Sequence, residues 1–94
     1  MEWRLFANLA EAAGTKHAVV DAEGGDTLGD AFEQLLGAHP DLEPIVLEDG
    51  ELADHIRLLR NETDPFVVDD GFETVLEDDD DLALFPPVSG GSSE

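Results

Sequence analysis

The segment TLGDAFEQLLG, residues 27–37, decides the fold, because it is the one long helix that the sequence predicts. Thr27 and Asp30 fit the capping box that begins a helix, with Asp in place of the usual Glu. Gly37 and the His39–Pro40 pair then end the helix. Apolar residues at near-helical spacing form one buried stripe: Leu28, Phe32, Leu35 and Leu36.

Two strand patterns precede this helix. Residues 2–9 alternate between apolar and polar side chains, except that Phe6 falls out of phase. Their apolar positions are Trp3, Leu5, Ala7 and Leu9. A short turn at residues 11–14 follows, and alternation returns over residues 16–22. The two strands are therefore predicted to form a hairpin.

Further strand patterns follow the helix. Residues 41–54 look irregular, with one short turn, and residues 55–60 read as a strand. Residues 66–68 fit a short edge strand, and residues 82–85 fit the last strand. The order ββαβ(β)β predicts an α+β domain, a mixed sheet of four to five strands with one main helix packed across it. Three apolar residues of the irregular segment are expected to lie under the sheet: Leu42, Ile45 and Leu47.

Charge is the most pronounced bulk property. The 94 residues include 24 Asp and Glu against four Lys and Arg, for a net charge of −20. Self-repulsion at that density destabilises a small fold in dilute buffer, and molar salt screens it. Because the chain has a single lysine, we interpret its surface as that of a halophilic protein rather than of an ordinary acidic domain. The same charge disfavours binding to nucleic acid or to an anionic membrane.

Missing residue types and segments exclude several functions. The chain has no cysteine, so it holds no disulfide, thiolate zinc site, cysteine-ligated iron–sulfur cluster or cysteine nucleophile. An electron carrier of the ferredoxin type is thereby excluded. No segment has the pattern of a signal peptide or a membrane span, which predicts a cytoplasmic protein.

No catalytic or metal-binding constellation is predicted. The acidic run at residues 77–81 lacks the spacing of a calcium loop and is expected to be a solvated turn. His17, His39 and His55 are scattered, which favours structural or surface roles. The serines near the end of the chain have no neighbouring base. We therefore expect no catalytic residue, no metal, no cofactor and no enzyme acting alone.

The end of the sequence has a specific order of residue types. Phe85 ends the last strand, because Pro86 and Pro87 donate no ladder hydrogen bonds and favour a stiff, extended segment. Val88 and Ser89 continue it, and Gly90 and Gly91 follow. A backbone without Cβ atoms threads a narrow channel, and the Gly91 carboxyl is open to attack. We expect a domain over residues 1–87 and a tail over residues 88–94 that another enzyme activates; the alternative is an idle flexible tail.

Four stretches together resemble a known family. They are LFA at 5–7, TLGDA at 27–31, HIRLLRN at 55–61 and LALFPPVSGG at 82–91. They are similar to the small archaeal ubiquitin-like modifier proteins, which belong with the sulfur carriers MoaD and ThiS in the ubiquitin-like β-grasp fold. The acidic surface points to the haloarchaeal branch.

The resemblance implies a function for the tail. An E1-like enzyme with MgATP adenylates the carboxylate of Gly91, while Gly90 gives clearance and residues 85–89 guide the tail and contact partners. A target lysine then forms an isopeptide bond; alternatively, a sulfur donor gives a thiocarboxylate for molybdopterin synthesis or tRNA thiolation, with a molybdopterin synthase large subunit as partner. One protein can serve both functions. The resemblance also implies a trimming or deconjugating metalloprotease, and a monomer when free. Lys16, the only lysine, is a candidate acceptor, although an ordinary surface role is favoured.

Two departures from the family pattern stand out. Asp79 occupies a turn position where the family has glycine, and Asp tolerates a left-handed conformation better than most residues. Ser92, Ser93 and Glu94 follow Gly91, where family members of this type usually end. With them present, Gly91 has an amide and no carboxylate to activate. There are three alternatives: a protease removes these residues, they are foreign to the natural chain, or the chain has lost its conjugating function. We favour removal.

Overall fold

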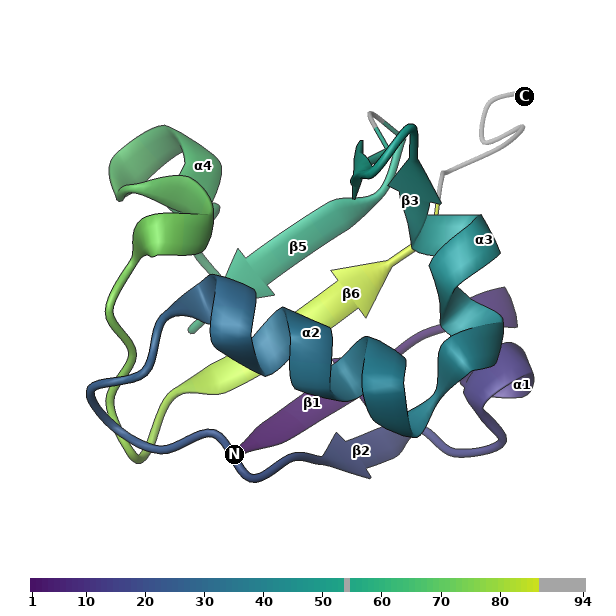
Figure 1. Ribbon diagram of the computed structural model, residues 1–94, viewed down its shortest axis with the longest axis horizontal. Coiled ribbons are helices and arrows are strands. Elements are labelled where there is room, and N and C mark those ends of the chain that lie inside the picture. The colour runs from purple at the N-terminus through teal and green to yellow at the C-terminus, as the bar shows by residue number, and fades with distance from the viewer. Residues whose placement is uncertain (54, 87–94) are drawn as a thin grey trace.

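A computed structural model describes residues 1–53 and 55–86 (Figure 1). Within them, a four-stranded sheet has the order β2-β1-β6-β5. Its central strands β1 and β6 are parallel, and the outer pairs are antiparallel. The mixed sheet and the predicted antiparallel pairing of the first two strands are therefore confirmed, although the second strand is shorter than the predicted residues 16–22. Its strands are β1 (Glu2–Leu5), β2 (His17–Val19), β5 (Arg57–Arg60) and β6 (Asp81–Phe85).

The long helix α2 (Leu28–Ala38) crosses one face of the sheet, as predicted (Figure 1). Its capping box is present in both directions, with Thr27 and Asp30 exchanging hydrogen bonds of 3.2 Å. The indole N–H of Trp3 donates to the Ala31 carbonyl at 3.2 Å, which fixes the helix over β1. The helix continues through Gly37 to Ala38, and His39 is its C-cap residue. The fully buried residues of its inner face are Leu28, Ala31 and Leu35, with Phe32 nearly so.

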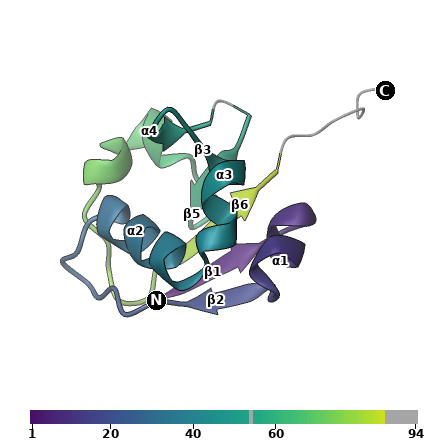
Figure 2. The ribbon, with the colours of Figure 1, turned by 45° about the vertical axis from the view of Figure 1, so that its right-hand side comes forward.

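The first strand is shorter than predicted, and a helix follows it. Ala7 has φ 54° and ψ −129°, and the N–H of Leu9 bonds to the Phe6 carbonyl at 3.1 Å, so the chain turns sharply after β1. Helix α1 (Asn8–Ala13) then replaces the predicted end of the strand and the predicted turn at 11–14. Leu9 is buried as expected, but it reaches the core from a helix. Figure 2 shows α1 at the end of β1, apart from α2.

The predicted edge strand at residues 66–68 is wrong. These residues lie in a short helix, α4 (Pro65–Val68), followed by the 3₁₀ helix η2 (Gly71–Glu73). Asp64 caps α4 by accepting the N–H of Phe66 at 2.9 Å, and proline is well suited to the first helical position. The β-branched Val67 and Val68 favour a strand in isolation, but the preceding cap and proline prevail.

Residues 40–52 are more ordered than the single turn predicted. They form η1 (Pro40–Leu42), α3 (Glu43–Val46), and the small hairpin of β3 (Leu47–Glu48) and β4 (Glu51–Leu52). Leu42 is fully buried, and Ile45 and Leu47 pack against the core at its margin, as predicted. Figure 2 shows α3 on the same side of the sheet as α2.

Candidate functional site

The exit of the last strand lies at the surface. Phe85 is the final residue of β6, and its ring stacks on that of Phe6 with centroids 4.3 Å apart and an interplanar angle of 9°. The parallel pairing of β1 and β6 sets Leu5 beside Leu84, which brings the next residue of each strand together. Phe6 remains 38% exposed, so the stack is an accessible apolar surface where the chain leaves the sheet.

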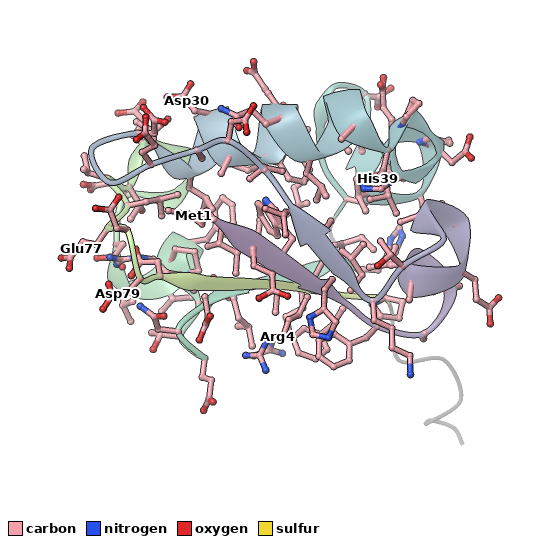
Figure 3. The ribbon with its side chains drawn as sticks, turned by 90° about the horizontal axis from the view of Figure 1, so that it is seen from below. Met1, Arg4, Asp30, His39, Glu77 and Asp79 are labelled. Carbon is pink, nitrogen blue, oxygen red and sulfur yellow. The ribbon has the colours of Figure 1, made fainter. Side chains whose placement is uncertain are left out.

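The stack belongs to a shallow hollow on the face of the sheet opposite α2. We call this surface the exit face and define it by Arg4, Phe6, Leu59, Ala83 and Phe85, which line the hollow together. Figure 3 shows Arg4 on this side of the sheet, away from the helix. Two carboxylates, of Glu62 and Asp81, stand at its border. The exit face is therefore mainly apolar, with one guanidinium.

Cationic side chains near this face lack internal partners. Within the described residues, Arg4, Lys16 and Arg57 form no ion pair, although the chain carries 24 acidic residues. The Nε of Arg4 is buried without a hydrogen-bond partner among the described residues. Lys16 and His17 border a second hollow that also includes Arg4 and Phe6. Arg4 and Lys16 are thus available to the carboxylates of another molecule, whereas His17 already contacts Glu2 at 2.6 Å.

The start of the same strand is built differently. Asp80 is only 6% exposed, and its carboxylate accepts from the backbone N–H of Glu77 at 2.8 Å. It also accepts from the Nε of Arg60 at 2.7 Å and from the side-chain amide of Asn61 at 2.8 Å. Asn61 in turn accepts the N–H of Asp81 at 2.9 Å. This network fixes the start of β6 against the end of β5.

The network also sets the protonation of its members. Burial acts to raise the pKa of Asp80, but the hydrogen bonds from Glu77, Arg60 and Asn61 outweigh it, so this pKa lies below its ordinary value. The hydrogen bond to Asp80 raises the pKa of Arg60. Both groups therefore stay charged across the neutral range.

The acidic turn differs from its predicted, solvated form. Asp80 is buried, and Asp78 accepts the N–H of Gly24 at 2.6 Å, so two of its carboxylates bond within the fold. No cluster of three or more potential metal ligands occurs among residues 1–53 and 55–86. Asp79 does not have positive φ, so its turn makes no use of the left-handed tolerance invoked for it. Positive φ falls instead on Asn61 and Glu62 of the preceding hairpin.

The structure places some of the predicted site residues. Phe85 is half-buried and contributes to the exit face, whereas Leu84 is fully buried and belongs to the core. Pro86 follows the strand, half-buried. Lys16 is exposed, consistent with a surface residue. The remaining predictions lie outside the described residues: Pro87, Val88, Ser89, Gly90, Gly91, Ser92, Ser93 and Glu94.

Sequence reasoning missed Phe6, Arg4 and Asp80 as site or anchor residues. Phe6 did carry a signal, since it is the apolar residue that breaks the alternation of its strand and therefore faces outward. Asp80 carried none, because it sits within a run of four identical residues. No helix in the described part of the chain is long and apolar enough to cross a membrane.

Comparison with known proteins gives the family. The model of the ThiS family matches residues 3–91. The chain belongs to the ThiS family. Within it, small archaeal modifier protein 1 of Haloferax volcanii is 53% identical over 92 residues, which covers 97% of this chain and 100% of that protein. A crystal structure of SAMP1 from the same organism has a TM-score of 0.82 at 50% identity, covering 97% of this chain and 98% of that one.

A more distant solved structure extends the likeness of fold. A chain in the crystal structure of the Amycolatopsis orientalis BexX/CysO complex has a TM-score of 0.80 at 20% identity, covering 96% of this chain and 98% of that one. At that identity, the likeness shows the shared fold alone. Together these matches confirm the predicted ubiquitin-like β-grasp fold and the resemblance to small archaeal modifier proteins. A ThiS-family protein of this kind is a carrier or modifier rather than an enzyme.

Proposed function

We propose that this chain is a ubiquitin-like protein modifier activated at Gly91 by an E1-like enzyme. The family match supports this most directly, because it extends through residue 91 and so includes the Gly90–Gly91 pair. The Gly91 carboxylate attacks the α-phosphate of ATP and releases pyrophosphate, which leaves an acyl adenylate. A lysine amine of the target then attacks the acyl carbon, loses a proton and expels AMP, giving an isopeptide bond.

The exit face is the surface that we assign to the activating enzyme. Its apolar stack of Phe6 and Phe85 stands where the chain leaves the sheet towards Gly91. Burying an exposed aromatic pair gives binding energy, and the unpaired Arg4 offers a charged contact that fixes orientation. Pro86 and Pro87, followed by Val88 and Ser89, then direct Gly90 and Gly91 into the enzyme.

Activation requires a chain that ends at Gly91. We propose that a protease, of the metalloprotease class implied by the resemblance, removes Ser92, Ser93 and Glu94. The free carboxylate exists only after that cleavage, since the bond to Ser92 otherwise makes it an amide. Lys16 is exposed and is the one lysine available for linking two copies through a side chain.

A second function uses the same adenylate. Attack on the acyl carbon by hydrosulfide from a sulfur donor, in place of an amine, expels AMP and gives a thiocarboxylate, the form in which a sulfur carrier delivers sulfur. Membership of the ThiS family and the fold shared with the CysO complex favour this alternative. Its partner is the large subunit of a molybdopterin synthase or a tRNA-thiolating enzyme.

The test compares three forms of the chain in the host: ending at Gly91, lacking Gly91, and carrying Gly91→Ala. Conjugates of high mass that require Gly91 support the modifier, and a molybdoenzyme or tRNA-thiolation defect on deletion supports the carrier. Arg60 is the last basic residue, so trypsin leaves residues 61–91 on a modified lysine, and the search must use that remnant. If the form ending at Gly91 yields no conjugates and no thiocarboxylate, the proposal is contradicted.

We further propose a monomeric, cytoplasmic protein that works at high salt and binds neither nucleic acid nor membrane. The net charge of −20 supports the high-salt, non-associating and non-binding parts of this proposal. Circular dichroism from molar to millimolar salt tests the halophilic part: the fold weakens as salt falls, because screening of the carboxylates is lost. Equal stability at both ends of the range overturns it.

A further inference from the structure

Strand β5 forms an edge of the main sheet, and the backbone N–H and C=O of one of its residues have no hydrogen-bond partner among the residues that the structure describes. In the described residues, β6 is its only strand neighbour. At its end, Asn61 donates its N–H to Asp81 beside β6, whereas Arg60 exchanges hydrogen bonds of 2.8 and 3.0 Å with Thr63 on the other side. Because alternate residues face opposite edges, Leu58 points its N–H and C=O outward like Arg60. No partner for either group is present in the described part of the chain.

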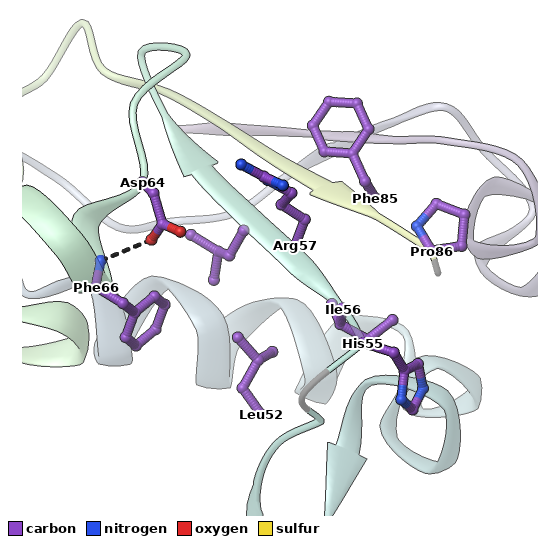
Figure 4. Close-up of a pocket in the computed structure, with 9 residues that line it drawn as sticks. Leu52, His55, Ile56, Arg57, Asp64, Phe66, Phe85 and Pro86 are labelled. Carbon is purple, nitrogen blue, oxygen red and sulfur yellow. Dashed lines mark hydrogen bonds between the residues drawn. The ribbon is translucent and has the colours of Figure 1, made fainter. Parts of the chain in front are cut away.

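The free edge opens onto a groove of about 480 Å³ (Figure 4). On the helix side of the sheet, Leu52, Ile56 and Phe66 line it. On the other side it is bordered by Arg57 and Phe85, which are paired across β5 and β6. A chain lying along the edge therefore meets apolar side chains on one face and a guanidinium on the other.

The apolar wall of this groove is held in place although it is exposed. Phe66 is 42% exposed, yet its ring packs edge-on against Phe72, with centroids 5.0 Å apart at 88°. Asp64, also in the groove, accepts the N–H of Phe66, and so its carboxylate caps α4 (Figure 4). Natural proteins usually cover or charge such an edge to prevent strand pairing. Here Arg57 is the charged residue that β5 itself contributes to the groove, while the Asp64 carboxylate that also lines it caps α4.

We propose that the β5 edge binds an extended segment of a partner protein as an added antiparallel strand. The residue opposite Leu58 exchanges two backbone hydrogen bonds with it, and its side chain points to the helix side, against Ile56 and Phe66. That residue is apolar. Its two neighbours point to the other face, where the one opposite Arg57 is acidic. The proposal does not rest on the activation of Gly91, although Phe85 borders both this groove and the exit face.

Charge identifies the partner segment. Arg57 is exposed and forms no ion pair within the described residues. A carboxylate opposite it gains a contact that no internal group supplies. The segment therefore has an acidic residue next to the apolar one, an alternation that suits a strand.

The probe is a synthetic peptide, acetyl-Thr-Glu-Val-Glu-Thr-amide, titrated into the full chain in molar salt and followed by NMR. We expect chemical-shift changes centred on Leu58 and slower exchange of its amide proton. A peptide with Lys in place of both Glu binds about fivefold more weakly, because it places like charge opposite Arg57. A peptide N-methylated at the central Val does not bind, because it lacks the N–H that the Leu58 carbonyl accepts.

Two variants separate the groove from the rest of α4. Arg57→Glu weakens the Glu peptide about fivefold and reverses the preference between the Glu and Lys peptides. Val67→Asp changes neither affinity, because Val67 is 78% exposed on α4 and does not line the groove. Shifts confined to β2 or the exit face, or none on β5 at millimolar peptide, overturn the proposal. If the Leu58 amide proton becomes protected from exchange as the protein concentration rises, without any peptide, the proposal is also overturned, because two copies of the chain then pair through this edge.

Discussion

The two ends of β6 differ in almost every physical respect. At the start, Asp80 is buried and accepts three hydrogen bonds, from Glu77, Arg60 and Asn61. At the exit, Phe85 contacts Phe6 through a ring stack that is open to solvent. One end is fixed by a polar network, and the other is an accessible apolar surface.

This difference separates stability from recognition along one strand. A buried carboxylate costs free energy unless its hydrogen bonds are satisfied, and the network at Asp80 satisfies them while fixing the register of β6. With the start fixed, Leu82 and Leu84 enter the core, and Phe85 emerges at the exit face. The exit can then remain exposed for a partner, because the strand does not depend on it for its position.

The largest expected effect comes from removing the carboxylate at the start. Asp80→Ala leaves Arg60, Asn61 and the Glu77 N–H without their acceptor, and should lower the free energy of unfolding by about 2–3 kcal/mol. Chemical denaturation in molar salt measures it. Asp79→Ala is the matched control, because Asp79 is exposed and makes no hydrogen bond in the described part of the chain. An equal loss in both variants contradicts the proposed role of Asp80.

A smaller effect, on activity rather than stability, is expected at the exit. Phe6→Ser should lower kcat/KM for adenylation of Gly91 about tenfold, or about 1.4 kcal/mol, because it removes half of the stack that we assign to the activating enzyme. Val19→Ser is the control, since Val19 is an exposed apolar residue of β2 that lies outside the exit face. If both variants are activated equally well, the exit face is not the docking surface.

A pH dependence sharpens the comparison at the start of the strand. The pKa of Asp80 is lower in the folded state, so its contribution to stability is complete above the unfolded pKa, near 4. It is lost as pH falls through the folded pKa, because the unfolded state takes up the proton first. The stability difference between the parent chain and Asp80→Asn should therefore be constant above about pH 5 and shrink in acid. Unfolding measured from pH 7 to pH 3 tests this, and a difference that grows in acid contradicts it.

The smallest effect is expected beside the exit. Ala7 has φ 54° and ψ −129°, a conformation that glycine adopts without strain, and it is exposed. Ala7→Gly should raise the free energy of unfolding by about 0.5–1 kcal/mol. The relief of backbone strain is larger than the extra conformational entropy that glycine loses on folding. Thermal unfolding measures the gain. A loss of stability shows instead that the turn before α1 is not strained.

Local patterns predicted much of this fold. Alternation found β1 and β2, and the capping box at Thr27 marked the start of α2. The sequence predicts that the first strand continues beyond residue 5, because Leu9 continues the alternation of Trp3 and Leu5 and Ala7 carries no turn signal. At α4, Asp64 and Pro65 are the signals that begin a helix, and they prevail over the two valines, which favour a strand.

The candidate site was less predictable, because it depends on pairing across long separations. Phe6 and Phe85 meet only through the parallel pairing of the first and last strands. Asp80 differs from its neighbours in the acidic run by its bonds to residues 60 and 61 of another strand. Neither contact leaves a pattern within a short window. The tail residues could be singled out from the sequence because proline and glycine determine the backbone conformation at their own positions.

The central claim is that Gly91 is the residue that an activating enzyme uses. ATP–pyrophosphate exchange, with the E1-like enzyme of the host, measures the adenylation step itself. We predict exchange with a chain that ends at Gly91 and none with a chain that ends at Gly90 or continues to Glu94. Exchange that is equal with all three chains, or absent with the chain ending at Gly91, contradicts it.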